Sequence, residues 1–591
     1  IYTNTPEESV SFTLPINTTN RTSFYRLAQH PNFAPSPSDA VIGPVTLESR
    51  LLNQVKANEP AWYQNEVAFT TYEITRNNDG QLITKCTKRG KPFFERPINL
   101  AQAKAVRALY NPSNNIPDYN FNQAIQANNH ALLDNLNASL PLNLRVSQEK
   151  IAAGKATLQS AGANARSILM PLDRLAKDGN HEGLSYALSA VPQLSKVGYF
   201  NGRFIIPDAM TITPEIFYES FEGLERRNEF PWSQNLSQEE IQRVTGWRTQ
   251  NEPLTLIRSR LYHSLKPLVA TCTTREEVFR TINDFAFVVS GWQLTPPTDA
   301  SIAAQLAGFT GRCEEQTGFV QSANYAFHNP VEAISVPAWA KADGNHQFPG
   351  LARYDSQGNL SGYATLNAAD PAGREKLDQF QNCEAPKLYT SSPFETDRDV
   401  TRWITITHPL PIAFTDFTRA PRASTAHLMV YNAGMLQPVA QTSITPTGYS
   451  FPDVGARSDL LYIITQDNGS GQLETMTHPI ILKEDGSKRV LASQPHLPGG
   501  ASDFNFYRLT DKEVGTPLGE GTYLITGWTQ DGTFFPMGQV TTEKQPNGSY
   551  ILPKVHLAGS GVLYQAFQGG NNNWSLAGRP FSVENNEVKR Y

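Results

Sequence analysis

The sequence reads Phe309-Thr-Gly-Arg-Cys-Glu-Glu-Gln-Thr-Gly-Phe319 around one of its four cysteines, and this stretch decides the expected fold. Cys313 follows a glycine-containing turn and opens a segment whose apolar residues recur at helical spacing as far as Phe327. The pattern predicts that the thiol lies at a helix N-terminus. Unpaired backbone N–H groups and the helix dipole stabilise an anion there, so we expect Cys313 to have a lowered pKa and to be the most reactive thiol.

A histidine that can pair with this cysteine follows 33 residues downstream. His346 comes after the apolar segment 333–336 and a tight turn at Asp343-Gly344, so we expect it to begin a strand and to face the sulfur. A cysteine, a histidine that removes its proton and a carboxamide or carboxylate that orients the histidine form an acyl-transfer site. The alternative is an inert buried thiol, which is the commoner role of a lone cysteine.

The residues that make up these motifs favour the acyl-transfer interpretation. The chain carries Gly311-Arg-Cys-Glu-Glu315, then Val336-Pro-Ala-Trp339, then Asp343-Gly-Asn-His346. Together they resemble the core of transglutaminase-like, papain-related proteins, especially the large multidomain type seen in Bacteroidetes-like bacteria, and the resemblance extends over about residues 170–591. It implies a Cys-His-Asn/Asp triad that needs no metal or organic cofactor. One departure is the stretch His346-Gln-Phe-Pro349, in which a proline is expected to interrupt strand pairing.

The resemblance also implies that a third catalytic residue ends the strand after the histidine's strand. The segment 351–366 is expected to form a hairpin that leads to Asn367, whose carboxamide oxygen can orient an imidazole. Asn367 is therefore the preferred candidate, and Asp370, part of an Asp-Pro pair, is the alternative. Asp355 lies at the predicted turn tip and is expected to point to solvent.

Three further residues are candidates for substrate binding or support. Arg312 and Glu314 flank the cysteine, and they either fix substrate or, as we prefer, pair with each other on the surface. Trp339 either shields the cleft from water or packs in the core. The sequence does not decide between these roles for Trp339.

Composition excludes several functional classes. The chain of 591 residues is long enough for several domains, and 39% hydrophobic with 18% charged residues is typical of globular protein. A formal net charge of −5 provides no basic surface for nucleic acid. The longest apolar runs, such as 285–289 and 460–464, are much shorter than the ~20 residues of a membrane span. We therefore expect neither a nucleic-acid partner nor a membrane span.

The cysteines and the first residues bear on metal binding and localisation. Cys86, Cys272, Cys313 and Cys383 do not have metal-ligand spacing, so no metal site is expected. The chain starts at Ile1 with polar residues following, as a processed mature chain would. This suits a secreted, periplasmic or cell-surface protein of bacterial origin.

Changes of pattern along the chain predict a multidomain α+β protein with five parts. They are a β-rich N-terminal domain (1–100), a helical region (101–269), a transglutaminase-like core (270–395), a β-sandwich module (396–494) and a C-terminal all-β module (502–591). In the last module, Trp528 and Trp574 suit sugar stacking if exposed, although a buried tryptophan is the commoner case in a sandwich.

The sequence thus leads to two hypotheses from different classes. The first is thiol-dependent acyl transfer on a protein, peptide or glycan-linked substrate, by a peptidase, an amidase or a cross-linking transglutaminase; the sequence does not choose between water and an amine as acceptor. The second is a non-catalytic surface, adhesion or assembly protein that keeps a degenerate version of the fold and can self-associate.

Overall fold

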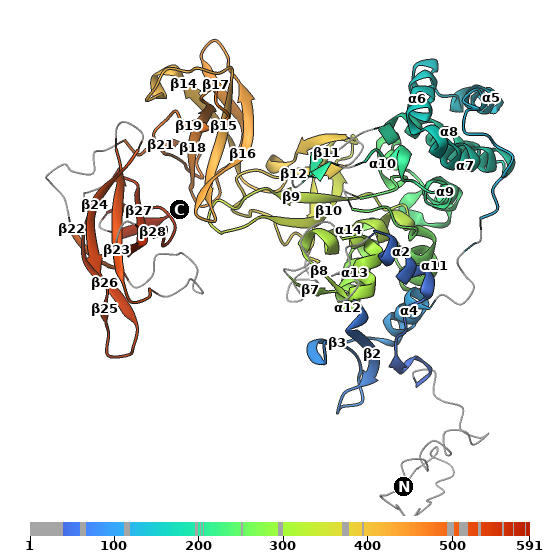
Figure 1. Ribbon diagram of the computed structural model, residues 1–591, viewed down its shortest axis with the longest axis horizontal. Coiled ribbons are helices and arrows are strands. Elements are labelled where there is room, and N and C mark those ends of the chain that lie inside the picture. The colour runs from blue at the N-terminus through green and yellow to red at the C-terminus, as the bar shows by residue number, and fades with distance from the viewer. Residues whose placement is uncertain are drawn as a thin grey trace, which may run out of the picture.

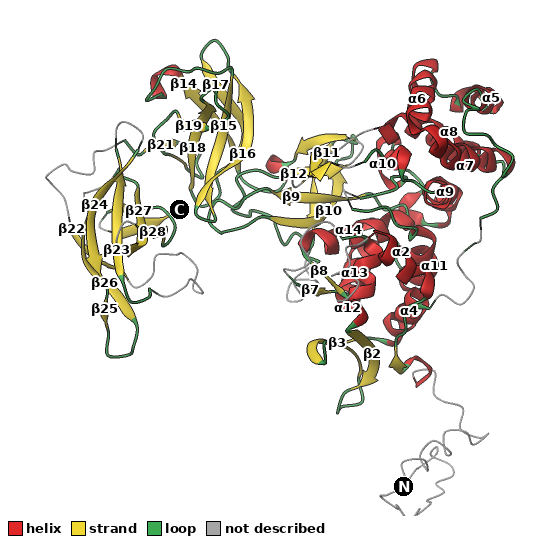
Figure 2. Cartoon of the chain, viewed as in Figure 1, coloured by secondary structure: helices red, strands yellow, loops and turns green. Residues whose placement is uncertain are grey.

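The computed structural model shows a multidomain protein of mixed α+β class, with helices gathered at one end and two β modules at the other (Figures 1 and 2). It describes residues 39–58, 67–111, 117, 119–195, 199–200, 203–204, 206–249, 252–293, 300–368, 377–392, 395–492, 502–506, 518–529, 533–557, 561–570, 573–585 and 587–591. A five-stranded sheet lies between the helices and the β modules (Figure 1).

The described N-terminal part contains the expected β structure. Its antiparallel sheet has the order β1 (Gly43–Pro44), β2 (Thr70–Arg76), β3 (Leu82–Lys88) and β4 (Lys91–Pro97). Gly80 has φ +78°, the left-handed conformation that the Asp-Gly hairpin turn predicts. Tyr72 stacks on Phe309 with ring centroids 4.1 Å apart, so this sheet packs directly on the segment that leads to Cys313. The strand expected at 10–14 lies outside the described residues.

One helix, α2 (Ser49–Asn58), lies within the part that was expected to be β-rich. The helices that follow are α4 (Leu100–Tyr110), α5 (Leu132–Ser139), α6 (Gln148–Ala161), α7 (Arg166–Lys177), α8 (His181–Ala190), α9 (Pro214–Glu222), α10 (Gln238–Val244) and α11 (Arg258–Val269). The sequence pattern predicts a helix from Leu254 to Leu265 that stops before Pro267. This prediction is wrong, because α11 begins at Arg258 and continues to Val269. Leu265 and Val269 are both fully buried, and their burial outweighs the one helical hydrogen bond that proline removes in the last turn.

The part that carries the cysteine joins three helices to a sheet. They are α12 (Arg275–Val289), α13 (Ile302–Gly308) and α14 (Cys313–Ala326), with a short parallel pair of β7 (Gly291–Trp292) and β8 (Thr310–Gly311). The antiparallel sheet has the order β11 (Leu360–Thr365), β10 (His346–Tyr354), β9 (Val331–Val336), β12 (Tyr389–Ser392) and β13 (Glu395–Asp399). β10 therefore lies inside the sheet and is paired on both sides.

Pro349 does not interrupt this sheet, which corrects our expectation. It pairs with Ala333 of β9, and its carbonyl oxygen accepts a hydrogen bond of 3.2 Å from the N–H of Leu366 on the other side. The missing N–H of the proline points to that same side, at the point where β11 has ended. The proline therefore costs one hydrogen bond at the end of a ladder and leaves the β9 pairing continuous.

The two faces of the sheet are filled differently. Leu351 of β10 packs in the same core as α14, whereas Phe348 packs in a second core with Ile334 of β9. Because side chains alternate along a strand, Gln347 belongs to the helix-covered face and His346 to the opposite face.

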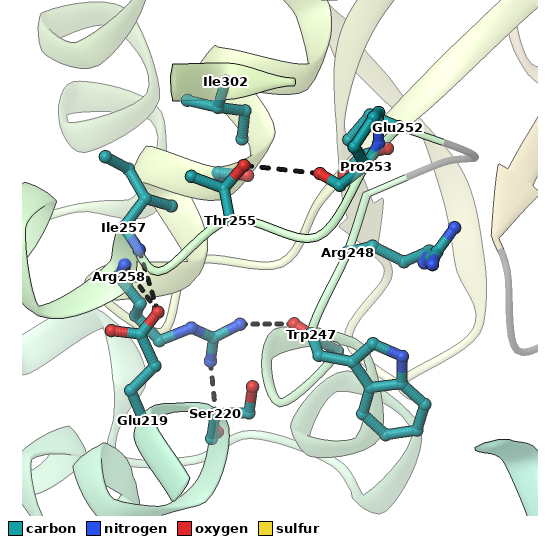
Figure 3. A pocket seen from close by; sticks show the side chains of 12 residues that line it. Glu219, Ser220, Trp247, Arg248, Glu252, Pro253, Thr255, Ile257, Arg258 and Ile302 are labelled. Atoms are coloured by element: carbon teal, nitrogen blue, oxygen red, sulfur yellow. Dashed lines mark hydrogen bonds between the residues drawn. The ribbon is translucent and has the colours of Figure 1, made fainter. Parts of the chain in front are cut away.

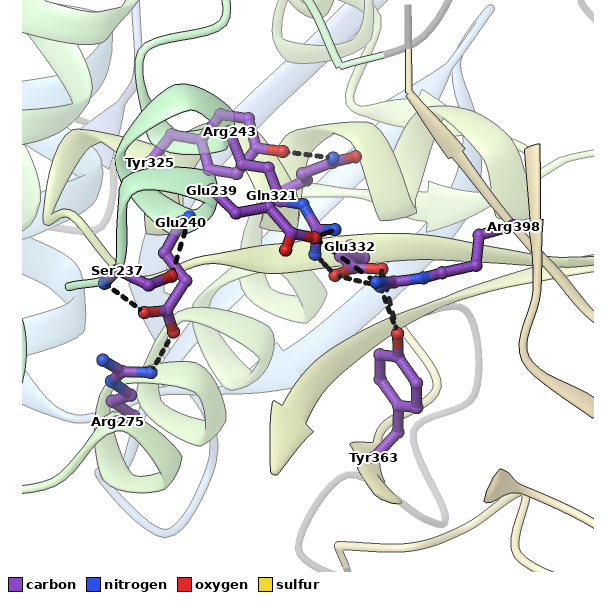
Figure 4. A network of polar contacts seen from close by, with 10 residues as sticks. All are labelled: Ser237, Glu239, Glu240, Arg243, Arg275, Gln321, Tyr325, Glu332, Tyr363 and Arg398. Atoms are coloured by element: carbon purple, nitrogen blue, oxygen red, sulfur yellow. Dashed lines mark hydrogen bonds and ion pairs between the residues drawn. The ribbon is translucent and has the colours of Figure 1, made fainter. Parts of the chain in front are cut away.

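A polar network anchors this second face to the helices (Figure 4). Glu332 of β9 is 4% exposed, and its carboxylate pairs with the guanidinium groups of Arg243 on α10 and Arg398 on β13. The Tyr363 hydroxyl donates to the same carboxylate at 3.1 Å, and Glu239 pairs with both arginines. Two carboxylates thus neutralise two guanidinium groups and connect α10 to three strands.

Two β modules complete the chain. The first contains β14 (Thr407–Ala413), β15 (Thr425–Asn432), β16 (Met435–Ser443), β17 (Gly448–Gly455), β18 (Leu460–Asp467), β19 (Leu473–Thr475), β20 (Ile480–Leu482) and β21 (Lys488–Val490). The second contains β22 (Ser502–Phe506), β23 (Thr522–Trp528), β24 (Phe534–Thr541), β25 (Glu543–Lys544), β26 (Tyr550–Leu557), β27 (Tyr564–Gly570), β28 (Asn573–Leu576), β29 (Phe581–Glu584) and β30 (Glu587–Arg590). Trp528 is buried between the modules, where its Nε1–H donates to His478 at 3.2 Å, so it is a core residue.

Candidate functional site

Cys313 begins helix α14, as the sequence predicts. The preceding helix ends at Phe309, which has a left-handed φ of +50°, and the chain then turns through Gly311. A Cβ atom at Gly311 would lie 2.8 Å from the Cβ of Glu315, so only glycine fits at this close approach. The tight turn places the cysteine at the first helical position.

Arg312 and Glu315 fix the start of the helix. The Glu315 carboxylate accepts the backbone N–H of Arg312 at 2.7 Å and pairs with its guanidinium at 3.0 Å. Arg312 also pairs with Glu314 at 3.7 Å, but both of those side chains are less than one-fifth exposed. The expected pair of Arg312 and Glu314 is therefore present, but it is largely buried and not on the surface, and the closer partner of Arg312 is Glu315, for which no role was expected.

Cys313 is largely buried, and this determines its acidity. Its thiol donates to Oε2 of Glu314 at 3.1 Å. Burial, followed by the charge and the hydrogen bond of Glu314, raises the pKa of Cys313 to about 12, while a backbone hydrogen bond from Gln347 and the charge of Arg312 act in the opposite direction. The expected lowering of this pKa is wrong: the effect of the helix N-terminus is smaller than those of desolvation and an adjacent carboxylate.

His346 is the first residue of β10, as expected, and lies opposite Val336 of β9. Its ring contacts three aromatic rings, with centroid distances of 6.3 Å to Trp339, 6.0 Å to Phe348 and 5.2 Å to Phe380. Burial lowers the pKa of His346, and the charge of Glu314 partly offsets that effect. The imidazole is therefore neutral near pH 7, and Trp339, half-buried, packs beside it.

Glu314 and Gln347 connect Cys313 to His346. Thr317, one turn after Cys313, donates its hydroxyl to the carbonyl oxygen of Gln347 at 3.3 Å. The N-terminus of α14 thus lies against the start of β10, at Gln347, the residue after His346. Glu314 bonds the thiol and also acts electrostatically on the imidazole.

The third position lies just beyond β11. Leu366 donates to Pro349 of β10, and Asn367, which is half-buried, follows directly after this last contact between the two segments. Asp370 lies outside the described residues. Asp355 is exposed at the turn tip and accepts the backbone N–H of Asn359 at 2.9 Å, so it points to solvent as expected.

The loop before His346, residues 337–345, is held by the β modules; we call it the histidine loop. The buried side chain of Asn432 donates to the carbonyl oxygens of Trp339, Ala342 and Gly344 at 3.0, 3.0 and 2.8 Å, and accepts the N–H of Gly344 at 3.0 Å. From the second module, Arg579 pairs with Asp343 at 3.0 Å and donates to the carbonyl of Ala340. Sequence reasoning missed both residues, because nothing local marks a contact with a loop 88 and 236 positions away.

Two small pockets lie beside α14. One is lined by Glu314, Glu315, Thr249, Glu252 and Ile302 among others, and holds about 20 Å³. A second pocket of about 20 Å³ shares Glu252 and Ile302 with it (Figure 3). Each has room for about one water molecule, and neither could hold a substrate.

The second pocket is lined by a buried carboxylate, that of Glu219. The Glu219 carboxylate accepts the backbone N–H groups of Ile257, Arg258 and Ser259 at 2.9 to 3.1 Å, where it caps the start of α11 (Figure 3). Burial raises the pKa of Glu219 to about 7, against these hydrogen bonds and the charge of Arg258. Its role is to satisfy a helix N-terminus that has no side-chain cap of its own.

Two further classes of site were sought. Within the described ranges, no group of three or more His, Cys, Asp or Glu side chains could hold a metal ion. Nor does that part of the chain contain a helix that is long and apolar enough to cross a membrane.

No protein-family model matches the sequence, and no curated protein matches it.

Proposed function

We propose that this chain carries out thiol-dependent acyl transfer on peptide or carboxamide substrates, with a core of transglutaminase-like type. Cys313 is the nucleophile, His346 the proton carrier, and Asn367 the group that orients the imidazole. The observation that carries the proposal is the position of Glu314, which bonds the thiol at 3.1 Å and partly offsets the lowering of the His346 pKa by burial. This carboxylate links the two groups that the reaction needs.

Before substrate binds, Cys313 and His346 are both uncharged. With a pKa of about 12, roughly one Cys313 thiol in 10⁵ is ionised at pH 7. A preformed thiolate would therefore cost about 7 kcal/mol. Proton removal must accompany attack on the substrate carbonyl, as it does for a serine nucleophile, rather than precede it.

The reaction then follows in two balanced steps. The sulfur forms a bond to the carbonyl carbon, its proton passes to His346, and the imidazolium returns that proton to the departing amine or ammonia as the C–N bond breaks. The thioester next transfers its acyl group to water or to a primary amine, which regenerates the thiol. Backbone N–H groups at the start of α14 are suited to hold the oxyanion.

The rival proposal is a non-catalytic surface or assembly protein. Two observations favour it: Cys313 is protonated, and the ring of His346 packs among aromatic side chains on the face of the sheet that α14 does not cover. Under either proposal we place the protein outside the cytoplasm, as a secreted, periplasmic or surface protein.

Acyl transfer can be tested with a glutamine-containing peptide, by measuring ammonia release and, with added hydroxylamine, hydroxamate formation. We expect the wild-type chain to show one or both and Cys313→Ala to show neither. Cys383→Ala is the matched control, since burial also raises the pKa of Cys383 to about 12. Equal activity in wild type and Cys313→Ala, or none in either together with no acyl adduct on Cys313 by mass spectrometry, would support the rival.

A further inference from the structure

A cavity of about 420 Å³ opens in the helical region, away from Cys313. It is bounded by the 3₁₀ turn Leu142–Leu144, the start of α6, and helices α8 and α10, which lie together at the upper right of Figure 1. Its volume falls within the range of small-molecule sites, about 300–1,000 Å³. It is much larger than the two water-sized pockets beside α14.

The lining is rich in neutral groups that both donate and accept hydrogen bonds. Amide side chains come from Gln193, Gln238 and Gln242, and hydroxyl groups from Tyr186 and Ser189. The Oε1 atom of Gln193 is buried and has no hydrogen-bond partner among the residues that the structure describes. A buried acceptor without a partner costs about 1–3 kcal/mol, and rotation of the Gln193 amide towards a ligand donor in the cavity would remove that cost.

Two of the charged side chains in the wall are already engaged by the protein. Glu182 pairs with Arg227, and the guanidinium of Arg145 donates to the carbonyl oxygens of Ala138 and Leu140 at 2.8 and 3.2 Å. Lys150 adds one cation from an exposed position. The ligand is therefore recognised mainly by uncharged groups.

We propose that this cavity binds a saccharide. Hydroxyl groups donate and accept in the same way as the amides that line the cavity, and the half-buried ring of Tyr186 offers an apolar surface to the C–H face of a sugar. Trp247 forms another part of the wall and is held in place by a 2.6 Å hydrogen bond from its Nε1–H to Asp208. A fixed aromatic side chain together with amide groups in one cavity suits a neutral, ring-shaped ligand.

The cavity is connected to the cysteine site by shared walls. Gly246 and Trp247 line both this cavity and the pocket of Figure 3, which shares Glu252 with the pocket beneath Glu314. A glycan attached to the acyl donor would thus bind on the side of α14 that carries Glu314. That extension rests on the proposed function, whereas saccharide binding does not.

Binding is tested with the full chain by saturation-transfer NMR. The probes are a β-linked disaccharide of glucose, a β-linked disaccharide of N-acetylglucosamine, and a neutral tripeptide of similar size. We expect transfer to at least one disaccharide, at least a fivefold weaker signal in Gln193→Met, which is close in volume, and loss of the signal in Tyr186→Ala. Gln148→Met, at the exposed start of α6 and outside the cavity, is the control and should bind like wild type.

Three outcomes overturn the inference: no transfer to either disaccharide, transfer that is equal in Gln193→Met and wild type, or transfer to the tripeptide alone. Melting temperatures of the variants show whether a lost signal reflects unfolding, and Gln193→Met remains the decisive variant if Tyr186→Ala does not fold. Cys313→Ala should bind the disaccharide normally. Failure of acyl transfer is thereby kept separate from failure of saccharide binding.

Discussion

Replacing Glu314 with glutamine should make Cys313 more acidic. The charge and the hydrogen bond of this carboxylate are the second and third causes of the raised pKa, after burial. A carboxylate about 4 Å from a thiolate repels it by about 4 kcal/mol at an effective dielectric constant near 20, which sets an upper limit of about three pKa units. We expect a fall of about one to three units in Glu314→Gln, with burial keeping the pKa above that of a free cysteine.

The assay is alkylation by iodoacetamide between pH 6 and 10, followed by mass spectrometry of the Cys313 peptide. At pH 8 the rate should rise at least about tenfold in Glu314→Gln, because the thiolate fraction rises tenfold for each pKa unit. Glu384→Gln is the matched control, since Glu384 raises the pKa of Cys383 by its charge and should leave Cys313 unchanged. An unchanged rate at Cys313 in Glu314→Gln would refute the electrostatic account of the site.

Three further variants test the scaffold. Asn432→Ala should lower the free energy of unfolding by about 2–4 kcal/mol, since it removes the side-chain donor to three loop carbonyls and the acceptor of the Gly344 N–H. It should also speed hydrogen exchange in residues 339–346, whereas Asn468→Ala at an exposed turn should do neither. Glu332→Ala should cost about 3–5 kcal/mol in urea unfolding, because Arg243 and Arg398 lose the buried one of their two shared carboxylates and keep only the exposed Glu239; a cost below about 1 kcal/mol would contradict the buried network. Glu219 has a folded pKa of about 7 against 4.5 ordinarily, so the folded state binds the extra proton and stability should fall by about 3 kcal/mol as pH rises from 4.5 to 7. Glu219→Gln should remove that slope, and an equally steep slope in the variant would show that another group titrates.

Local patterns predicted the elements well where the residues that define them are neighbours in sequence. Helix α4 runs from Leu100 to Tyr110 as its spacing indicates, because Asn99 caps it and its apolar residues face one core. Helix α14 begins at Cys313 for a similar reason: Gly311 and the capping residues lie within four positions.

The same reasoning failed where burial or strand pairing, which depend on residues distant in sequence, outweighed a local preference. Proline was expected to end α11 and to interrupt β10, yet both elements continue because buried side chains or a neighbouring strand stabilise them. The acidity of Cys313 was misjudged for the same reason. The helix N-terminus is readable from sequence, but the 3.1 Å approach of Glu314 and the depth of burial are not.

The fixed parts of the site bear on the route that the proton takes in the proposed reaction. Glu315 and Arg312 hold the start of α14, and Asn432 and Arg579 hold the histidine loop, so the backbones that carry the thiol and the imidazole are fixed. The side chain that faces both groups is Glu314, which can accept the thiol proton and pass it on with a change of rotamer alone.

Glu314→Gln therefore separates thiol acidity from turnover. A glutamine cannot accept and release that proton, and without the carboxylate the pKa of His346 falls further. The variant should alkylate faster than wild type at pH 8 and yet transfer acyl groups more slowly, by at least about tenfold, because general acid–base steps contribute about 10²–10⁴. A variant that is faster in both reactions would mean that His346 takes the proton directly, and that Glu314 only holds the thiol in its protonated form.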